Sequence, residues 1–305
     1  MMLSLMIPSE QEVFHEKQLF AGHPDTLYYH DTSNDTFNKT PRHSPPRINA
    51  LVPLKREIKI SEYLKSKNVD SKYLSLPNWI ISPDGVPIII QPFNPDGDLL
   101  NWLIDNPSLK IDTATAKVFL NCIIDILLIL QNNNVSHNDL CPENFMVDKL
   151  NKNFYLIDYG QGIIFNENMN REWNPNNYVR PYLLPPDMFT IHGEKCFMEI
   201  KEIKELIFKK DMFVIGGILY MILFRNQLWE CDLSISSEEK IKVLNKSRLK
   251  WNSFMNDSTR THNECIMFKI LLGLLPVKLD DVISLDELCN LINELGNSGK
   301  KRKRF

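Results

Sequence analysis

The most informative stretch of this chain is Ser136-His137-Asn138-Asp139-Leu140-Cys141-Pro142-Glu143-Asn144-Phe145, and the triplet Asp158-Tyr159-Gly160 follows it. Asn144 comes five residues after Asp139, and Asp158 comes fourteen residues after Asn144. We expect Asp139 to accept or orient a hydroxyl proton, and Asn144 with Asp158 to hold Mg²⁺ against nucleotide phosphates. The alternative is two polar turns that flank a hairpin. The order and spacing of the three side chains favour chemistry over that alternative.

Four segments, in order along the chain, resemble the eukaryotic protein kinase family, and the resemblance covers residues 12–295. Residues 137–144 match the catalytic loop H-R-D-L-K-P-E-N at six of eight positions, 158–160 are similar to D-F-G, 180–187 to the run that closes the activation segment, and 211–220 to the start of the central helix. The resemblance implies an α+β, bilobal protein-kinase-like fold with a small β-rich N-lobe and a larger helical C-lobe. We expect an N-terminal extension at 1–11, the N-lobe at 12–92, the C-lobe at 93–295 and a basic tail at 296–305.

Local patterns agree with a strand-rich first part and a helical second part. Strands are expected at 28–30, 36–37, 86–90, 145–147 and 154–157, and a long loop at 165–187. Helices are expected at 53–67, 98–104, 113–131, 239–250, 262–274 and 284–295, with a buried helix at 212–223. Pro53 suits the first turn of its helix, because proline lacks the N–H that this turn leaves unpaired.

The resemblance assigns roles in the second lobe and at the end of the first. Asp139 matches the catalytic base, and Asn144 with Asp158 matches the metal-binding residues. Glu57 matches the helix glutamate that pairs with a strand lysine in the first lobe. Lys39, 18 residues before Glu57, is our candidate for that lysine, and Lys55 is a poorer one because it lies on the same helix.

Nucleotide-binding positions follow from the same resemblance. Gly22 is the one surviving glycine of a glycine-rich loop, and Pro92 and Asn94 fall beside the adenine. The carbonyl of Pro92 is an acceptor and the N–H of Asn94 is a donor. Asp98 falls where a carboxylate meets the ribose. Phe37 takes the position of a small residue above the adenine, where a ring narrows the pocket.

Two substitutions distinguish the catalytic loop. Cys141 replaces the lysine that contacts the γ-phosphate in the family, which predicts slower transfer. Asn138 replaces the arginine that binds a phosphorylated activation segment, and residues 158–187 contain no Ser or Thr. We therefore expect no activation by Ser/Thr phosphorylation in that segment. An insertion is expected at 190–208, because the gap from Asp187 to Asp211 exceeds that of the family.

The sequence leaves three functional hypotheses open. The first is ATP- and Mg²⁺-dependent phosphoryl transfer to Ser or Thr of protein substrates. The second is a pseudokinase, a binding or scaffold protein that kept the fold and lost efficient chemistry. The third, a small-molecule kinase of related fold, is weaker because the match continues through residues 211–220. The first two imply a protein partner.

Composition restricts the class of protein. The chain has 305 residues, of which 43% are hydrophobic and 24% charged, as in globular proteins. The net charge is −3 although residues 300–304 supply five cations, so the folded domain is not expected to bind nucleic acid. No membrane segment is expected. Six cysteines without a CxxC pair suggest a reduced intracellular protein. The basic tail resembles a nuclear localisation signal, which predicts a cytoplasmic or nuclear location, or both.

Overall fold

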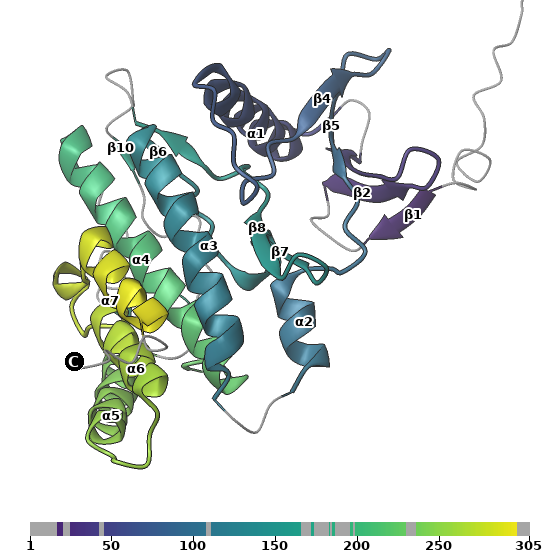
Figure 1. The fold of residues 1–305 in the computed structure, drawn as a ribbon. Helices are drawn as coiled ribbons and strands as arrows, with labels where there is room; N and C mark the ends of the chain where they lie inside the picture. Colours follow the sequence, from purple (N-terminus) through teal and green to yellow (C-terminus); the bar gives the residue numbers. More distant parts are fainter. Residues whose placement is uncertain are drawn as a thin grey trace, which may run out of the picture. The chain divides into compact units, whose positions relative to one another are not determined.

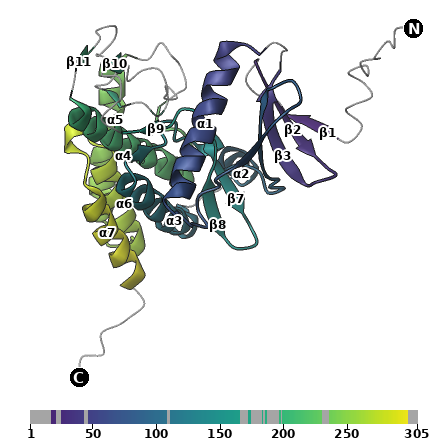
Figure 2. The same ribbon diagram turned by 90° about the horizontal axis from the view of Figure 1, so that it is seen from above.

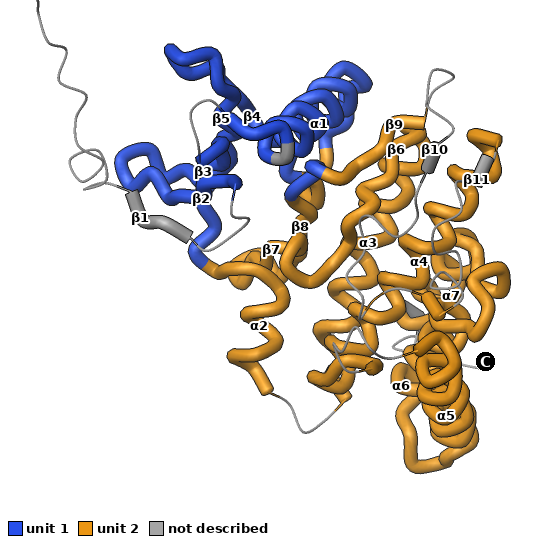
Figure 3. Tube along the Cα trace, turned by 180° about the vertical axis from the view of Figure 1, so that it is seen from behind, with its two compact units in different colours: residues 1–70, 75–95, 158–160 blue, residues 71–74, 96–157, 161–305 orange. Residues whose placement is uncertain are grey.

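The structure is a computed structural model (Figures 1 and 2). It describes residues 17–20, 25–42, 46–107, 111–165, 172–173, 183, 185–186, 196–197, 199–229 and 236–297. The chain divides into two compact units (Figure 3). Unit 1 comprises residues 1–70, 75–95 and 158–160, and unit 2 comprises 71–74, 96–157 and 161–305. Unit 1 is built on a sheet and unit 2 is mainly helical, which confirms the predicted α+β class.

Unit 1 contains a five-stranded antiparallel sheet in the order β1-β2-β3-β5-β4. Its strands are β1 (Lys17–Phe20), β2 (Thr26–Asp31), β3 (Thr36–Pro41), β4 (Asn78–Ile81) and β5 (Pro87–Pro92). The strands expected at 28–30 and 36–37 are present within β2 and β3, which pair as a hairpin. Its turn is closed by Asp31, whose carboxylate accepts hydrogen bonds from the Ser33 amide and from Asn34 Nδ2. This local bonding is typical of Asp in turns.

Helix α1 (Ile48–Ser66) packs against β3, β4 and β5. It begins five residues before the predicted start at residue 53, and Pro53 lies inside it rather than in its first turn. The prediction was wrong because proline favours the first turn of a helix but does not require that the helix begin there. The apolar face continues on both sides of Pro53, where Ala50 and Leu54 are fully buried, and this packing supports the first turns of the helix.

Unit 2 is built around two long helices, α3 (Thr113–Asn132) and α4 (Ile200–Phe224), which pack against each other. Helices α5 (Ser237–Met255), α6 (His262–Leu274) and α7 (Leu285–Asn297), with the short helix η5 (Leu279–Asp281), complete the helical part. Among the described helices, only α3 is long and apolar enough to cross a membrane. Eight of its side chains are buried in the core of unit 2, as expected of a core helix.

Short strands and helices frame the catalytic-loop region of unit 2. They are α2 (Leu99–Asp105), β6 (Val135–Ser136), η1 (Pro142–Asn144), β7 (Phe145–Asp148), β8 (Asn153–Leu156) and β9 (Ile163–Ile164). β7 and β8 correspond to the strands expected at 145–147 and 154–157 and form a hairpin, and β6 pairs with β9. A second pair joins β10 (Glu172–Trp173) to β11 (Cys196–Phe197). Most of the predicted loop at 165–187 lies outside the described residues.

Helix α4 begins twelve residues before the predicted buried helix at 212–223. Its start is fixed by a capping box. The side chain of Glu199 accepts the backbone N–H of Glu202, and the side chain of Glu202 accepts the backbone N–H of Glu199. Residues 200–208, which were expected within an insertion, therefore form the first turns of α4. The prediction missed them because these turns carry charges, and only the later turns are buried nearly all round.

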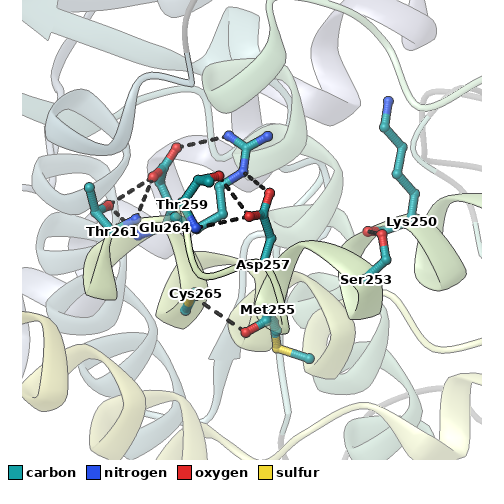
Figure 4. Close-up of polar contacts among 9 residues, drawn as sticks. Lys250, Ser253, Met255, Asp257, Thr259, Thr261, Glu264 and Cys265 are labelled. Carbon is teal, nitrogen blue, oxygen red and sulfur yellow. Dashed lines mark hydrogen bonds and ion pairs between the residues drawn. The ribbon is translucent and has the colours of Figure 1, made fainter.

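The connection between α5 and α6 is closed by a polar cluster (Figure 4). The carboxylate of Asp257 accepts the Thr259 amide, and Thr261 forms a capping box with Glu264. Arg260 bridges the two, with its Nη1 3.2 Å from Glu264 Oε1 and its Nε 3.7 Å from Asp257 Oδ2. These bonds define where α6 begins, because they satisfy N–H groups that the first turn leaves unpaired.

Candidate active site

Lys39 lies on β3 and directs a buried ammonium group toward two carboxylates. Its Nζ is 2.9 Å from Glu57 Oε2 and 2.8 Å from Asp158 Oδ1. All three residues belong to unit 1. The structure thus brings together three residues that the sequence analysis selected separately, from a strand, a helix and the D-Y-G triplet. Lys55, the alternative lysine, is exposed on α1.

The charges of this cluster are coupled. Burial raises the pKa of Glu57 to about 7; the ammonium of Lys39 opposes that rise and the carboxylate of Asp158 adds to it. Burial disfavours the charge on Lys39, but Asp158 and Glu57 outweigh this effect and hold the pKa of Lys39 above its usual range. One cation therefore faces two carboxylates, and Glu57, which is only 2% exposed, is the one that tends to keep a proton.

The D-Y-G triplet is fixed by local contacts within unit 1. Asp158 has a left-handed backbone with φ of 60°, and its Oδ1 accepts the Gly160 amide at 3.1 Å. A Cβ at Gly160 would lie 3.0 Å from that oxygen and 3.3 Å from Pro53 Cβ, so a side chain there would require one of these neighbours to shift. The Tyr159 amide donates to Glu57, and Arg56 donates to the Gly160 carbonyl. The triplet is therefore tied to α1 through both its backbone N–H and C=O groups.

Two aromatic rings share the sheet face that carries Lys39. Tyr28 pairs directly with Lys39 across β2 and β3, and Phe37 lies two residues from Lys39 on the same strand. Cross-strand partners and alternate residues of a strand point to the same face. The two ring centroids are 6.1 Å apart, and Lys39 Nζ is 5.8 Å from the centre of the Tyr28 ring. Tyr28 was missed from the sequence because the register before residue 50 was poorly defined.

The predicted adenine-contacting residues lie at the end of β5. Pro92 is the last residue of β5, and Asn94 follows two residues later. The Phe93 amide between them donates to the Asp35 carbonyl at 3.1 Å, and the His30 ring stacks on Phe93 with centroids 3.7 Å apart. This anchors the segment to the β2–β3 hairpin. Gly22 lies outside the described residues.

Asp139 and Asn144 lie together in unit 2. Asn144 Nδ2 donates to the Asp139 carbonyl at 2.7 Å, and the backbone N–H of Asn144 donates to the Cys141 carbonyl. The Asn144 carbonyl accepts the Ile157 amide, and the Ile157 carbonyl is 2.8 Å from His137 Nε2. The loop is thus bonded to the residue that immediately precedes Asp158 in sequence. His137 is fully buried in this framework.

Asp98 caps the N-terminus of α2 in unit 2. Its two carboxylate oxygens accept the Asn101 amide at 2.8 Å and Asn101 Nδ2 at 2.7 Å. Burial raises the pKa of Asp98, and the hydrogen bonds from Asn101 oppose that rise. The structure therefore gives this carboxylate a capping role, and its predicted contact with ribose stays a prediction. Asp98 is also bridged to Met146 on β7.

A buried lysine under the catalytic loop was missed by the sequence analysis. Lys210 on α4 is 1% exposed, and its Nζ donates to the side-chain oxygen of Asn138 and, at 3.2 Å, to the Asn138 carbonyl. Asp211, the next residue, accepts Ser136 Oγ at 2.6 Å. The available signal was a lysine directly before the matched Asp211, just ahead of the apolar run that begins at Met212. Cys141 is fully buried in the same loop.

The described residues contain no group of three or more His, Cys, Asp or Glu side chains that could hold a metal ion by themselves. Asp158 and Asn144 nevertheless carry carboxylate and amide oxygens, and oxygen is the donor that Mg²⁺ prefers. Magnesium in nucleotide sites takes one or two protein ligands together with phosphate oxygens and water. The donor chemistry of these two residues fits that mode of binding.

Comparisons with known proteins agree with this geometry. A family model described as the protein kinase domain matches residues 39–291, a range that begins at Lys39 and includes Asp139, Asn144 and Asp158. A chain in a solved structure of the CAK complex from Chaetomium thermophilum, bound to ATP-γ-S, is 15% identical to this chain. The similarity covers 90% of this chain and 88% of that chain, with a TM-score of 0.65, and it shows a shared fold.

Proposed function

The chain belongs to the protein kinase family, and from that premise we propose that it transfers the γ-phosphoryl group of ATP to Ser or Thr hydroxyls of a protein substrate. The observation that carries the proposal is the contact of Lys39 with both Glu57 and Asp158. In kinases the strand lysine, the helix glutamate and the first residue of D-F-G must be in place together for transfer. This arrangement favours an enzyme over a chain that has lost the chemistry.

The residues of unit 1 position the nucleotide in this proposal. Lys39 binds the α- and β-phosphates, and Glu57 holds its ammonium in place. Phosphate binding would bring further negative charge to Lys39, so the second carboxylate, Asp158, must be balanced by a cation. Mg²⁺ bound to Asp158 and Asn144 would supply that charge and neutralise charge that develops on the transferred group.

Asp139 acts as the base in unit 2. Its carboxylate accepts or orients the proton of the attacking hydroxyl, and its backbone carbonyl is held by Asn144. Cys141, which replaces a lysine, supplies no charge to the γ-phosphate. Loss of one such electrostatic contact costs about 10²–10³ in kcat in other enzymes, so we expect slow turnover.

Activation by Ser/Thr phosphorylation of the segment after Asp158 is not part of the proposed mechanism. Residues 158–187 contain neither Ser nor Thr. Asn138, at the position of the phosphate-binding arginine, is buried and bonded to Lys210 and to the Gln161 carbonyl. Protein treated with a Ser/Thr phosphatase should keep its full rate of transfer.

A second function, a pseudokinase that binds or scaffolds a protein partner, is favoured by the rings of Tyr28 and Phe37. Both lie on the sheet face of Lys39, where a nucleotide base would have to lie beside them. If these rings exclude ATP, the contact between Lys39 and Glu57 would serve the fold alone. Nucleotide binding therefore separates the two functions before any substrate is known.

The test combines binding and transfer. Thermal shift with ATP, with and without Mg²⁺, should show stabilisation, because ATP at 100 times its Kd adds about 2.7 kcal/mol to the free energy of unfolding. Single-turnover transfer from labelled ATP to a generic Ser/Thr substrate should then be compared among wild type, Asp139→Asn and Asp158→Asn. We expect transfer in wild type alone, and a loss of the Mg²⁺ effect in Asp158→Asn. Transfer that survives Asp139→Asn undiminished would reject Asp139 as the base, and no ATP binding at all would favour the pseudokinase.

A further inference from the structure

Lys210 is a cation in the interior of unit 2. Its side chain is 1% exposed, and its Nζ contacts Asn138 through two oxygens and lies 3.6 Å from Asp211 Oδ1. Burial lowers the pKa of Lys210, while the carboxylates of Asp211 and Asp139 act against this effect. A charged lysine in a protein interior is costly unless it makes good hydrogen bonds. A neutral residue of similar size would avoid that cost.

The partner of Lys210 has an unusual backbone. Asn138 has a φ of 62°, in the left-handed region, and is 1% exposed. Asn tolerates this region better than most residues. Both ends of its side chain are used, because Oδ1 accepts Lys210 Nζ and Nδ2 donates to the Gln161 carbonyl at 3.2 Å. The backbone of Asn138 is thus held by α4 on one side and by the segment after Gly160 on the other.

The carbonyl of Asn138 belongs to the peptide unit that joins it to Asp139. Lys210 donates to that carbonyl at 3.2 Å, on the N-terminal side of Asp139. On the C-terminal side, Asn144 Nδ2 donates to the Asp139 carbonyl at 2.7 Å. Side-chain donors therefore hold both peptide units that flank Asp139. Because a peptide unit is planar, fixing these two carbonyls restricts the backbone dihedrals of Asp139 and the direction of its side chain.

We propose that Lys210 is a positioning residue for Asp139, which holds the catalytic loop in its productive conformation from inside unit 2 without a phosphorylated side chain. This inference rests on the proposed phosphoryl transfer. It predicts that loss of Lys210 slows the chemical step more than it weakens ATP binding, since Lys210 contacts the loop of the base. A displacement of about 1 Å in a catalytic group can cost on the order of 100-fold in rate.

The test compares Lys210→Met with a matched control, Lys240→Met. Lys240 is also 1% exposed, but it lies on α5 with its Nζ over the Trp229 ring. We expect Lys210→Met to lower kcat about 10- to 100-fold with KM for ATP within about twofold. Lys240→Met should keep kcat within about twofold, once both variants are measured at temperatures where they are folded. Equal losses of kcat in the two variants would overturn the inference, because any buried lysine would then give the same effect.

A second readout does not depend on activity. Amide hydrogen exchange, followed by mass spectrometry, should rise in peptides that cover 136–144 in Lys210→Met and stay unchanged there in Lys240→Met. Unchanged protection of 136–144 in Lys210→Met would overturn the inference even if kcat fell. If wild type shows no Asp139-dependent transfer, the proposed function fails. Raised exchange in Lys210→Met would still show that Lys210 stabilises the conformation of residues 136–144.

Asn138→Gly serves if Lys210→Met does not fold. Glycine accepts the left-handed backbone without strain and removes the side-chain acceptor of Lys210. The backbone contact remains, so we expect a smaller loss of kcat, about threefold, again with little change in KM for ATP. Wild-type kcat together with wild-type protection of 136–144 in Asn138→Gly would contradict the inference.

Discussion

Lys39 and Glu57, 18 residues apart in sequence, form a buried ion pair in which Nζ lies 2.9 Å from Oε2. The same ammonium lies 2.8 Å from Asp158 Oδ1, so the pair also fixes the start of the D-Y-G triplet. A lone lysine between two carboxylates leaves the cluster with an excess negative charge. Burial raises the pKa of Glu57 to about 7; the ammonium of Lys39 opposes that rise, and the carboxylate of Asp158 adds to it.

Lys39→Met should lower the rate of phosphoryl transfer by about 100-fold or more, because it removes the cation assigned to the phosphates. Lys55→Met is the matched control, since Lys55 is exposed on α1 two residues from Glu57. It should change the rate less than about twofold. Steady-state transfer from labelled ATP measures both. A larger loss in Lys55→Met would show that the wrong lysine has been assigned.

The pKa of Glu57 predicts how stability depends on pH. The unfolded chain releases this proton near 4.5, whereas the folded protein keeps it until about 7. Between these values the folded state binds more protons, so its stability decreases as pH rises. The contribution is on the order of 3 kcal/mol. Urea unfolding of wild type and Glu57→Gln from pH 4.5 to 7.5 should show wild type losing stability relative to the variant.

Asp158→Asn provides the internal check on this prediction. Its carboxylate is one of the groups that raise the pKa of Glu57. Without it, Lys39 serves Glu57 alone, and the loss of stability should occur at lower pH than in wild type. An identical pH profile in Asp158→Asn would mean that Asp158 and Glu57 do not share the ammonium.

The sequence alone predicted the parts of the site that lie in continuous motifs. Asp139, Asn144 and Asp158 could be selected as candidates because their spacing is set by one loop and one hairpin, which are local structures, and their roles stay predictions. Lys39 was selected from its sequence separation of 18 residues from Glu57, and the two side chains are in contact in the structure. Tyr28 was missed because its place beside Lys39 depends on the pairing of β2 with β3, which no short pattern encodes.

Helix boundaries were less predictable for the same reason. Pro53 predicted the start of α1, but α1 begins five residues earlier, where tertiary packing of Ala50 supports its first turn. The first turns of α4 carry charged residues, so the sequence there lacks the continuous apolar pattern of a buried helix. Only the capping box marks where the helix begins. Lys210 was overlooked because a lysine beside an aspartate is usually solvent-exposed, and here the fold buries it.

Phe37→Ala should strengthen ATP binding, because the ring takes space that the base requires. We expect the Kd for ATP to fall about tenfold, which corresponds to about 1.4 kcal/mol. The ring lies on the Lys39 face of β3, 6.1 Å from Tyr28 between centroids. Isothermal titration with ATP and Mg²⁺ measures the change. Trp79→Ala, on strand β4 of the same unit, is the control and should not alter binding. Weaker binding in Phe37→Ala would instead make the ring a stacking partner of the base.

Lys210→Met should differ from wild type in the pH dependence of its stability. Burial lowers the pKa of Lys210 below its ordinary value of 10.5, with the carboxylates of Asp211 and Asp139 opposing it. From the lowered pKa up to 10.5 the unfolded chain binds more protons than the folded protein, so raising the pH favours the folded state. Wild type should therefore gain stability relative to Lys210→Met as pH rises from 7 toward 10.5. Other lysines contribute equally to both proteins and cancel in the difference. Urea unfolding at several pH values measures it, and a difference that stays constant or reverses would mean that burial does not lower the pKa of Lys210.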